Sequence, residues 1–402
     1  MLRKPHYAWL VCLGGSLALM ITMGLGANVF TVYQPEIIAR NGFTNAQGSW
    51  ITTTRTLFIL GTLLCVNQIC ARLGLRLTMT LGMLLIGISC FTFGLCKTFP
   101  MYCLSAAITG VGYCLGGMVP LSLIISNWFT ARRSLALGIS SAGSGISTIF
   151  VPPVVTLLIQ NRGLKTAFFC EGTFVLLVTA VTWCLLRTHP ADLGLEPYGA
   201  PIQSPVSPSK GQERKLPVVP ILLAAFLLGG PLGPAFSHLA VLFSSKGFDP
   251  MVVAGLISYL GIALCVGKVI SGHLYDRLGG LRTNYCIFLM YLAGHLLCVG
   301  ANNVPMAVLA LTVFAFGVSV SAVSPAVWAA DLASAEDYPK LVRTITVSYT
   351  AGMLFSGPIP GILADRTGSY APAYLLFAAF LAVSMALVQG VYHRYGLGGK
   401  PS

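Results

Sequence analysis

The sequence is poor in charged residues. Only 9% of its 402 residues are Asp, Glu, Lys or Arg, whereas about a quarter of the residues of a soluble globular protein are charged. With 55% hydrophobic residues, the chain has too few polar side chains to cover a water-exposed surface. The composition therefore excludes a soluble globular protein and predicts an all-α membrane protein that crosses the bilayer many times.

Acidic residues are scarcer than basic ones, with 11 Asp and Glu against 24 Lys and Arg. We expect all of them in loops or within a turn or two of the end of an apolar run. No carboxylate is then expected at the middle of the membrane, where it would neutralise a buried cation. A drug/proton exporter would need such a membrane acid, so this class is disfavoured.

Signals of enzyme chemistry are also missing. The sequence shows no nucleophile–base arrangement, no phosphate-binding loop and no spacing suited to a metal. The 12 cysteines include no CxxC pair, and nearly all lie in apolar runs, where cysteine packs as a small hydrophobe. We therefore expect neither an enzyme nor a bound cofactor.

Long apolar runs make up most of the sequence. Twelve of them approach the roughly 20 residues needed to cross a bilayer. Of the 24 Lys and Arg residues, sixteen fall on the side that contains the N-terminus and six on the other, which predicts cytoplasmic termini in the cell membrane by the positive-inside rule. Nucleic acid is not needed to explain the net charge of +13. The predicted spans are 8–33, 47–70, 77–96, 100–126, 134–159, 166–187, 217–243, 251–274, 283–300, 305–329, 342–364 and 370–392.

One long polar stretch, residues 188–216, divides these spans six and six. Its Pro, Ser, Gly and charged residues are typical of a linker. The predicted organisation is thus a six-helix bundle at 1–187, a cytoplasmic linker at 188–216, and a six-helix bundle with a short tail at 217–402. Arg-Leu-Gly recurs at the same place in both halves. Duplicated halves are typical of an alternating-access transporter that binds its substrate near the bilayer midplane, and we expect a monomer.

The loop after the eighth span reads GHLYDRLGGLR at 272–282. It resembles the G-x-L-x-D-R-x-G-x-x-R loop of the major facilitator superfamily, over a chain of matching architecture. The resemblance implies the major facilitator fold and a cytoplasmic gate. The first-half copy has Ala71 where the aspartate should be, so its gate needs other contacts. The predicted gating residues are Gly272, Asp276, Arg277, Gly279, Arg282, Arg72, Arg132 and Arg133.

Three further stretches narrow the resemblance. NWFTARRSLALGISSAGSGIS (127–147), HPADLGLEPYG (189–199) and PGILADRTGSYAPAY (360–374) are similar to the monocarboxylate transporters and the related oxalate/formate antiporters. This branch implies transport of a small carboxylate. The first span opens KPHYAWLV, without the Gly- and Trp-rich pattern of animal members, which favours a bacterial relative.

Lys268 is a basic residue inside a predicted span. It stands eight residues before Asp276, roughly 12 Å along a helix, and an ionisable group so deep is a functional candidate. Its position four residues before Gly272 matches a basic residue of the branch, which implies that it binds the substrate carboxylate. A lysine that snorkels to the cytoplasmic surface is the alternative.

Arg55 is the second cation inside a span, 17 residues or roughly 25 Å before Arg72. It would either snorkel outward or line the outer mouth and attract anions. Weaker candidates for substrate binding are polar residues for which an ordinary interhelical hydrogen bond is an equal interpretation. They are Asn28, Tyr33, His238 and Tyr349.

The substrate expected from these residues is a small organic anion, since an unpaired cation needs a counter-ion. The second lysine of oxalate antiporters is missing on the eleventh span, which favours a monocarboxylate. Leu264 replaces the aspartate of some animal members, so exchange with another anion, uniport and proton symport stay open. A neutral solute such as a sugar or nucleoside is the alternative. Paired interruptions at VPP (151–153) and SGPIPG (356–361), with GGPLGP (229–234), predict hinges.

Overall fold

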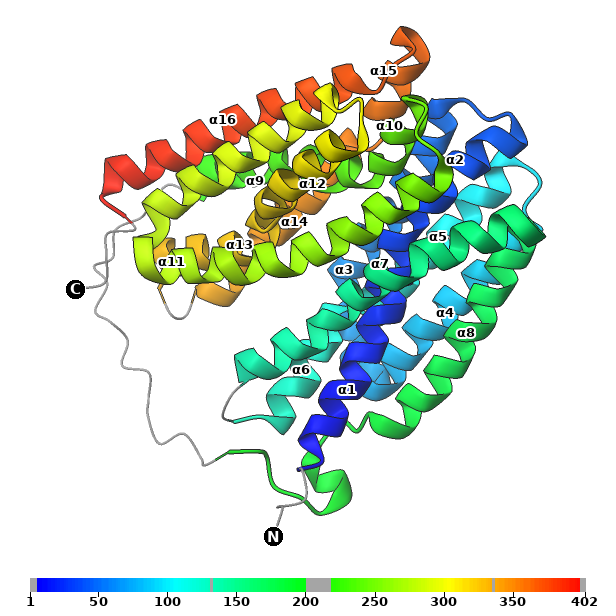
Figure 1. The fold of residues 1–402 in the computed structure, drawn as a ribbon. Helices are drawn as coiled ribbons and strands as arrows, with labels where there is room; N and C mark the ends of the chain where they lie inside the picture. The colour runs from blue at the N-terminus through cyan, green and yellow to red at the C-terminus, as the bar shows by residue number, and fades with distance from the viewer. Residues whose placement is uncertain (1–5, 131–132, 200–217, 335–336, 398–402) are drawn as a thin grey trace. The chain divides into compact units, whose positions relative to one another are not determined.

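The computed structural model is built of helices throughout the part that it describes, residues 6–130, 133–199, 218–334 and 337–397 (Figure 1). These ranges contain no strand, and their one isolated β-bridge pairs Phe129 with Tyr198. The predicted all-α class is confirmed.

The helices of the first half lie between residues 8 and 193, and those of the second half between residues 218 and 395. In the first half they are α1 (Ala8–Leu19), η1 (Met20–Val29), α2 (Phe30–Asn41), α3 (Asn45–Leu73), α4 (Leu75–Leu95), α5 (Phe99–Leu115), α6 (Met118–Trp128), α7 (Arg133–Arg162), α8 (Leu164–Leu185) and η2 (Pro190–Leu193). In the second half they are α9 (Val218–Gly230), η3 (Pro231–Ala235), α10 (Leu239–Ser245), α11 (Pro250–Gly300), α12 (Val304–Val318), α13 (Val320–Leu332), α14 (Tyr338–Ser356), α15 (Ile359–Thr367) and α16 (Ala371–Tyr395).

Ten segments of the described chain are long and apolar enough to cross a membrane alone, two of them within α11. The two other predicted spans are each built from two consecutive helices. The span at 305–329 joins α12 to α13 at Ser319, and the span at 342–364 joins α14 to α15 at Gly357 and Pro358. The break at SGPIPG therefore occurs where it was predicted, whereas Pro152 and Pro153 lie inside an uninterrupted α7.

The repeated Arg-Leu-Gly has the same backbone conformation in both halves. Gly74 has φ 82° just before α4, and Gly279 has φ 75° at the kink that divides α11 into two spans. A positive φ with an extended ψ is accessible almost only to glycine. Both glycines thus make the same turn between consecutive spans, as expected of a duplicated half.

The described helices form two compact units. Unit 1 comprises Met1–Phe43 and Thr54–Pro205, and unit 2 comprises Thr44–Thr53 and Val206–Ser402. The first turns of α3 therefore belong to unit 2 and the rest of that helix to unit 1. The division at 188–216 stays a prediction, because residues 200–217 lie outside the described chain and Tyr198 pairs with Phe129 inside unit 1.

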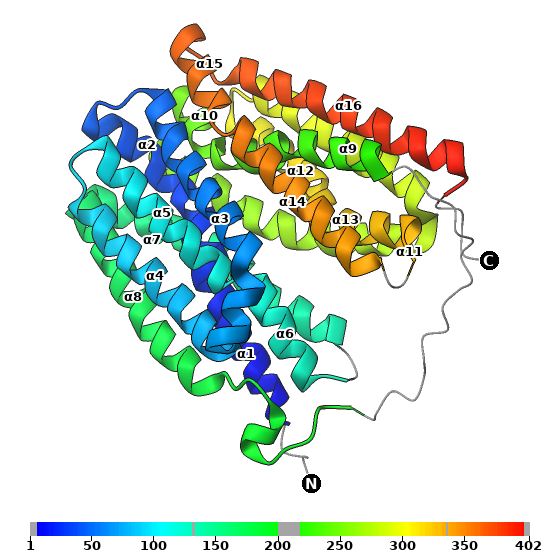
Figure 2. The ribbon, with the colours of Figure 1, turned by 180° about the vertical axis from the view of Figure 1, so that it is seen from behind.

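Glycine permits close helix packing at corresponding places in the two units. In unit 1, a Cβ on Gly143 of α7 would overlap the backbone oxygen of Ser16 in α1. In unit 2, a Cβ on Gly352 of α14 would overlap the backbone oxygen of Phe226 in α9, and α9 and α14 lie side by side in Figures 1 and 2. The small residues of 138–147 thus allow α7 to approach α1 closely.

Candidate functional site

Arg55 is buried in unit 1, with 7% of its surface exposed. Its Nη1 donates a 3.1 Å hydrogen bond to the carbonyl oxygen of Gly26, and its guanidinium lies 5.6 Å from the ring centroid of Phe30. Its Nε is buried without a hydrogen-bond partner. The guanidinium is thus held inside the bundle by η1 and α2, which argues against outward snorkelling.

Lys268 lies on α11 in unit 2 and its side chain is exposed. It makes no hydrogen bond or ion pair with another residue of the described chain, where the only salt bridge joins Arg40 to Glu36 at 3.1 Å. Neither Arg55 nor Lys268 is therefore neutralised by a carboxylate among the described residues. Each unit contributes one such cation from a membrane-spanning helix.

The first span of each unit contains π-helix. In unit 1 it is η1, and in unit 2 it is the shorter η3 at the predicted GGPLGP interruption. π-Helical turns are rare and occur often at functional sites. The interruption at η1 was not predicted, because its sequence contains no proline. The carbonyl that binds Arg55 belongs to Gly26, within η1.

Three of the four weaker candidates are held by bonds between helices. Asn28 Nδ2 donates to Thr148 Oγ1 at 2.9 Å. His238 is fully buried, and its ring nitrogens lie 2.7 Å from Ser49 Oγ and from the carbonyl oxygen of Pro234. These contacts match the structural interpretation of each residue.

Tyr33 is the third of these, and its partner is an acid. Its hydroxyl donates to Glu171 Oε2 at 2.6 Å, and its ring stacks on Phe168 with centroids 4.1 Å apart. Tyr349, the fourth candidate, is partly buried on α14 beside the side chain of Thr350.

Glu171 lies within the expected two turns of a span end, but its side chain is buried. It lies seven residues into α8, roughly 10 Å from the start of the helix, and only 8% of its surface is exposed. Sequence distance predicts that Glu171 lies near a span end, but it does not reveal that the side chain turns into the bundle. One signal was available, since Glu171 is the one carboxylate within a predicted span.

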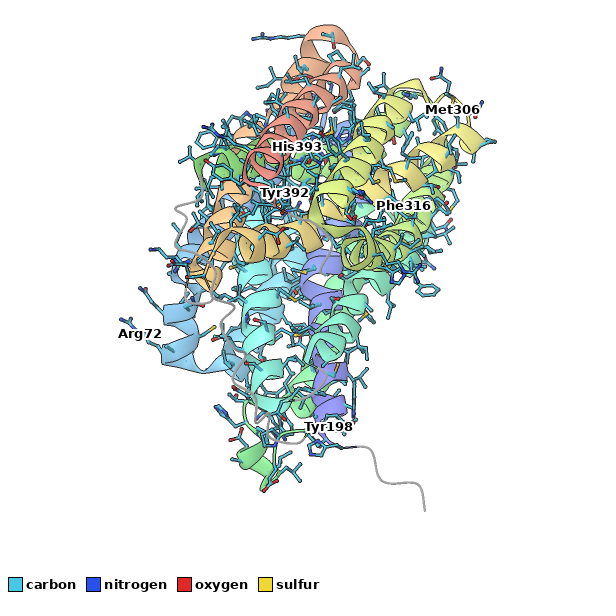
Figure 3. All side chains as sticks on the ribbon, turned by 90° about the vertical axis from the view of Figure 1, so that its left-hand side faces the viewer. Arg72, Tyr198, Met306, Phe316, Tyr392 and His393 are labelled. Carbon is cyan, nitrogen blue, oxygen red and sulfur yellow. The ribbon has the colours of Figure 1, made fainter. Side chains whose placement is uncertain are left out.

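The predicted gating residues are described only in part. Arg72, Arg277 and Arg282 are exposed, and Figure 3 shows Arg72 projecting from the end of α3. Gly279 makes the turn described above. Arg132 lies outside the described residues, while Arg133, Gly272 and Asp276 are described only in their helical backbone.

Two of the stretches that carried the resemblance pair with each other in unit 1. Tyr198 N–H donates to the carbonyl oxygen of Trp128 at 2.8 Å, and Thr130 N–H donates to that of Tyr198 at 3.1 Å. The Tyr198 ring contacts those of Trp9 and Phe129. This contact fixes the start of the polar stretch against the turn that leads into α7.

The third stretch, residues 360–374, caps the N-terminal end of α3 in unit 2. Asp365 accepts hydrogen bonds from the backbone N–H of Asn45 at 2.9 Å and of Ala46 at 2.8 Å, and from the Asn45 side chain at 2.9 Å. Partial burial raises the pKa of Asp365, but these hydrogen bonds outweigh it and hold the pKa below its ordinary value.

Comparison with known proteins gives relatives over most of the chain. Monocarboxylate transporter 13 of Rattus norvegicus is 24% identical over 412 residues, which cover 97% of this chain and 90% of the relative. Monocarboxylate transporter 12 of Homo sapiens is 26% identical over 363 residues, which cover 81% and 70%.

Solved structures share the fold at low sequence identity. The nucleoside transporter NupG is similar with a TM-score of 0.77 and 12% identity, over 96% of this chain and all of that one. A D-xylose-proton symporter has a TM-score of 0.75 at 13% identity, over 95% and 97%. Residues 15–294 match the Major Facilitator Superfamily. The chain thus belongs to the major facilitator superfamily and is a membrane transporter with twelve spanning segments in two six-helix repeats, not an enzyme.

Proposed function

We propose that this transporter carries a small organic anion, in the first instance a monocarboxylate, by alternating access. The observation that carries the proposal is the pair of cations Arg55 and Lys268, one in each unit. Neither has a carboxylate partner among the described residues. A cation in a membrane-spanning helix is costly unless a counter-ion or a polar cavity compensates it, and a transported carboxylate supplies the counter-ion.

The relatives support an anion over a neutral solute. Two relatives that match most of the chain are named monocarboxylate transporters, at 24% and 26% identity. The structures named for a nucleoside and for xylose are 12% and 13% identical and support the fold alone. A sugar or nucleoside would also leave both cations without a counter-ion.

The two cations have different roles in this scheme. Lys268 binds the carboxylate as a point charge, while Arg55 offers a planar fork whose Nη1 is already oriented by the Gly26 carbonyl. Asn28, Tyr33 and His238 shape the surroundings through their contacts between helices, and Tyr349 does so from α14. Arg72, Arg277 and Arg282 form the cytoplasmic gate together with the other predicted gating residues. The protein acts as a monomer in the cell membrane, with both termini in the cytoplasm.

The test is uptake of radiolabelled lactate, pyruvate, acetate and oxalate into proteoliposomes. Lys268→Ala and Arg55→Ala should each reduce uptake at least tenfold, because each leaves the carboxylate without a charge-assisted bond worth about 1.5–3 kcal/mol. Lys268→Arg should retain transport. Lys97→Ala is the matched control, since Lys97 is exposed in the connection after α4. Normal uptake by Lys268→Ala, or uptake of a sugar or nucleoside but no carboxylate, would overturn the proposal.

A further inference from the structure

Glu171 is a buried acid that anion binding alone does not use. Its carboxyl lies on α8 inside unit 1, and its one hydrogen bond comes from the Tyr33 hydroxyl at 2.6 Å. No cation forms a salt bridge with it in the described part of the chain. Burial of an unpaired carboxylate costs several kcal/mol, so the structure calls for a group that neutralises it during transport.

The described residues around Glu171 supply no cation, so a proton is the group that neutralises its carboxylate. The titratable side chains facing it are the Tyr33 hydroxyl of α2 and the buried Cys90 thiol of α4, neither of which is a cation. Cys170, its neighbour on α8, is exposed. Phe168 stacks on Tyr33, and Phe93 stacks on Phe168 with centroids 5.3 Å apart, so the tyrosine that binds Glu171 is part of an aromatic stack.

One helical segment connects this acid to the buried cation. Arg55 binds the carbonyl of Gly26 and lies over Phe30, while Glu171 binds Tyr33, three residues further along α2. The rings of Phe30 and Tyr33 are themselves in contact, with centroids 6.4 Å apart. A change in charge at either end therefore acts on the same segment, which begins in the π-helical η1.

We propose that Glu171 is the proton-binding residue that couples proton entry to carboxylate transport. A proton from the outside binds a Glu171 carboxyl oxygen, crosses with the anion and leaves on the inside, without covalent chemistry. A carboxylate at Arg55 and a proton on Glu171 together leave neither of these two buried side chains with an unpaired charge, whereas either one alone does. This cost favours movement of the doubly loaded carrier. The inference rests on the proposed carboxylate transport and selects proton symport among its modes.

The experiment measures accumulation and exchange separately in proteoliposomes, with protein-free vesicles subtracted for passive entry of the undissociated acid. The probe is whichever monocarboxylate of the panel the wild type carries. With an inward gradient of one pH unit, a one-proton symporter accumulates its anion about tenfold, since one unit equals 1.36 kcal/mol. Glu171→Gln should accumulate to a ratio of about one yet still exchange internal for external anion. Glu171→Asp should recover accumulation in part.

Controls separate coupling from folding. Glu36→Gln removes an exposed carboxylate of the same unit, paired with Arg40, and should accumulate as the wild type does. Tyr33→Phe keeps the ring stack but removes the hydrogen bond, so it should move the pH of half-maximal uptake. This variant serves as the test if Glu171→Gln fails to fold, as judged by its melting temperature in detergent.

The outcomes distinguish the two proposals. Wild-type carboxylate transport with equal tenfold accumulation by Glu171→Gln overturns the role of Glu171 and leaves carboxylate transport standing. If Glu171→Gln does not fold, an unchanged pH profile in Tyr33→Phe overturns the role of Glu171 and also leaves carboxylate transport standing. Absence of any carboxylate uptake by the wild type overturns both.

Discussion

Replacement of Asp365 by alanine tests how the N-terminal end of α3 is held in unit 2. The change removes three hydrogen bonds, two of them from the backbone N–H groups of Asn45 and Ala46, which have no acceptor within the helix. Loss of an acceptor for such N–H groups costs about 1 kcal/mol, and up to about 2 kcal/mol. Asp365 is exposed, so water takes over part of the bonding, and we expect about 1 kcal/mol.

Asp249→Ala provides the matched comparison. Asp249 caps α11 with a single hydrogen bond to its backbone, from Met251 N–H at 2.8 Å. Its removal should cost about 0.5 kcal/mol, the lower end of the range for caps. The two substitutions delete the same side chain and differ in the number of bonds lost.

The assay is hydrogen exchange of residues 44–53, read by mass spectrometry in lipid nanodiscs. A loss of 1 kcal/mol corresponds to about fivefold faster exchange, because 1.4 kcal/mol is a factor of ten. Exchange in Asp365→Ala should therefore rise about fivefold in this segment and stay unchanged in α8. Unchanged exchange at 44–53, with the melting temperature unchanged as well, would refute the reasoning.

The pH dependence of this effect has a definite sign. The hydrogen bonds of Asp365 hold its folded-state pKa below the ordinary value of the unfolded chain, despite partial burial. Its contribution is thus fully present above the unfolded pKa and is lost as the pH falls through the folded pKa. The difference between wild type and Asp365→Ala, corrected for intrinsic exchange, should be constant near neutral pH and disappear in acid. A difference that grows in acid would contradict the assignment.

Three further substitutions test the packing and the turns. Gly143→Ala should lower the melting temperature in detergent, since its Cβ meets backbone at an overpacking cost of about 1–3 kcal/mol, whereas Gly138→Ala, which has open space, should not. Gly279→Ala should cost about 1–3 kcal/mol by chemical denaturation because of its positive φ, while Gly390→Ala in the exposed face of α16 should be neutral or slightly stabilising. Lys246→Met should speed exchange at the end of α11, because Lys246 Nζ binds three carbonyl oxygens there at 2.7–2.9 Å.

The sequence was sufficient for most of the architecture. Hydropathy located the spans because the hydrocarbon core fixes their length, and the repeated Arg-Leu-Gly located the turns because Gly74 and Gly279 need a positive φ. Two of the three interruptions predicted from proline were found, at Pro231 and at Pro358, whereas α7 continues through Pro152 and Pro153. The π-helix of η1 was missed because it depends on packing against neighbouring helices, and hydropathy does not respond to a change from four-residue to five-residue turns.

The candidate site was predictable in residue type but not in pairing. Arg55 and Lys268 were found from composition, since a cation inside an apolar run is rare. Whether a polar side chain is free or bonded depends on residues far apart in sequence, such as Asn28 with Thr148, and His238 with Ser49. No local pattern specifies those partners.

The hydrogen-bond partners of the stretches 127–147, 189–199 and 360–374 show which part of the fold these motifs specify. Trp128 pairs with Tyr198 in one unit, and Asn45 pairs with Asp365 in the other. The first pair is formed by backbone groups and the second by the Asp365 carboxylate, and both lie at the ends of spans. These motifs therefore specify connections between helices. They are compatible with many substrates, and substrate class has to be argued from the cations.

Glu171 shows most clearly that the motifs and the residues proposed to carry transport are different parts of the sequence. None of the motifs contains it, and its bond to Tyr33 lies within the helix bundle. Leu264 occupies the place where some carboxylate transporters have an acid, so proton coupling here would need another carboxylate. Glu171 is buried, carries one hydrogen bond and shares the segment of Gly26 to Tyr33 with Arg55. The proposed coupling residue is therefore Glu171, which contacts the same helical segment as the cation Arg55 in the proposed anion site.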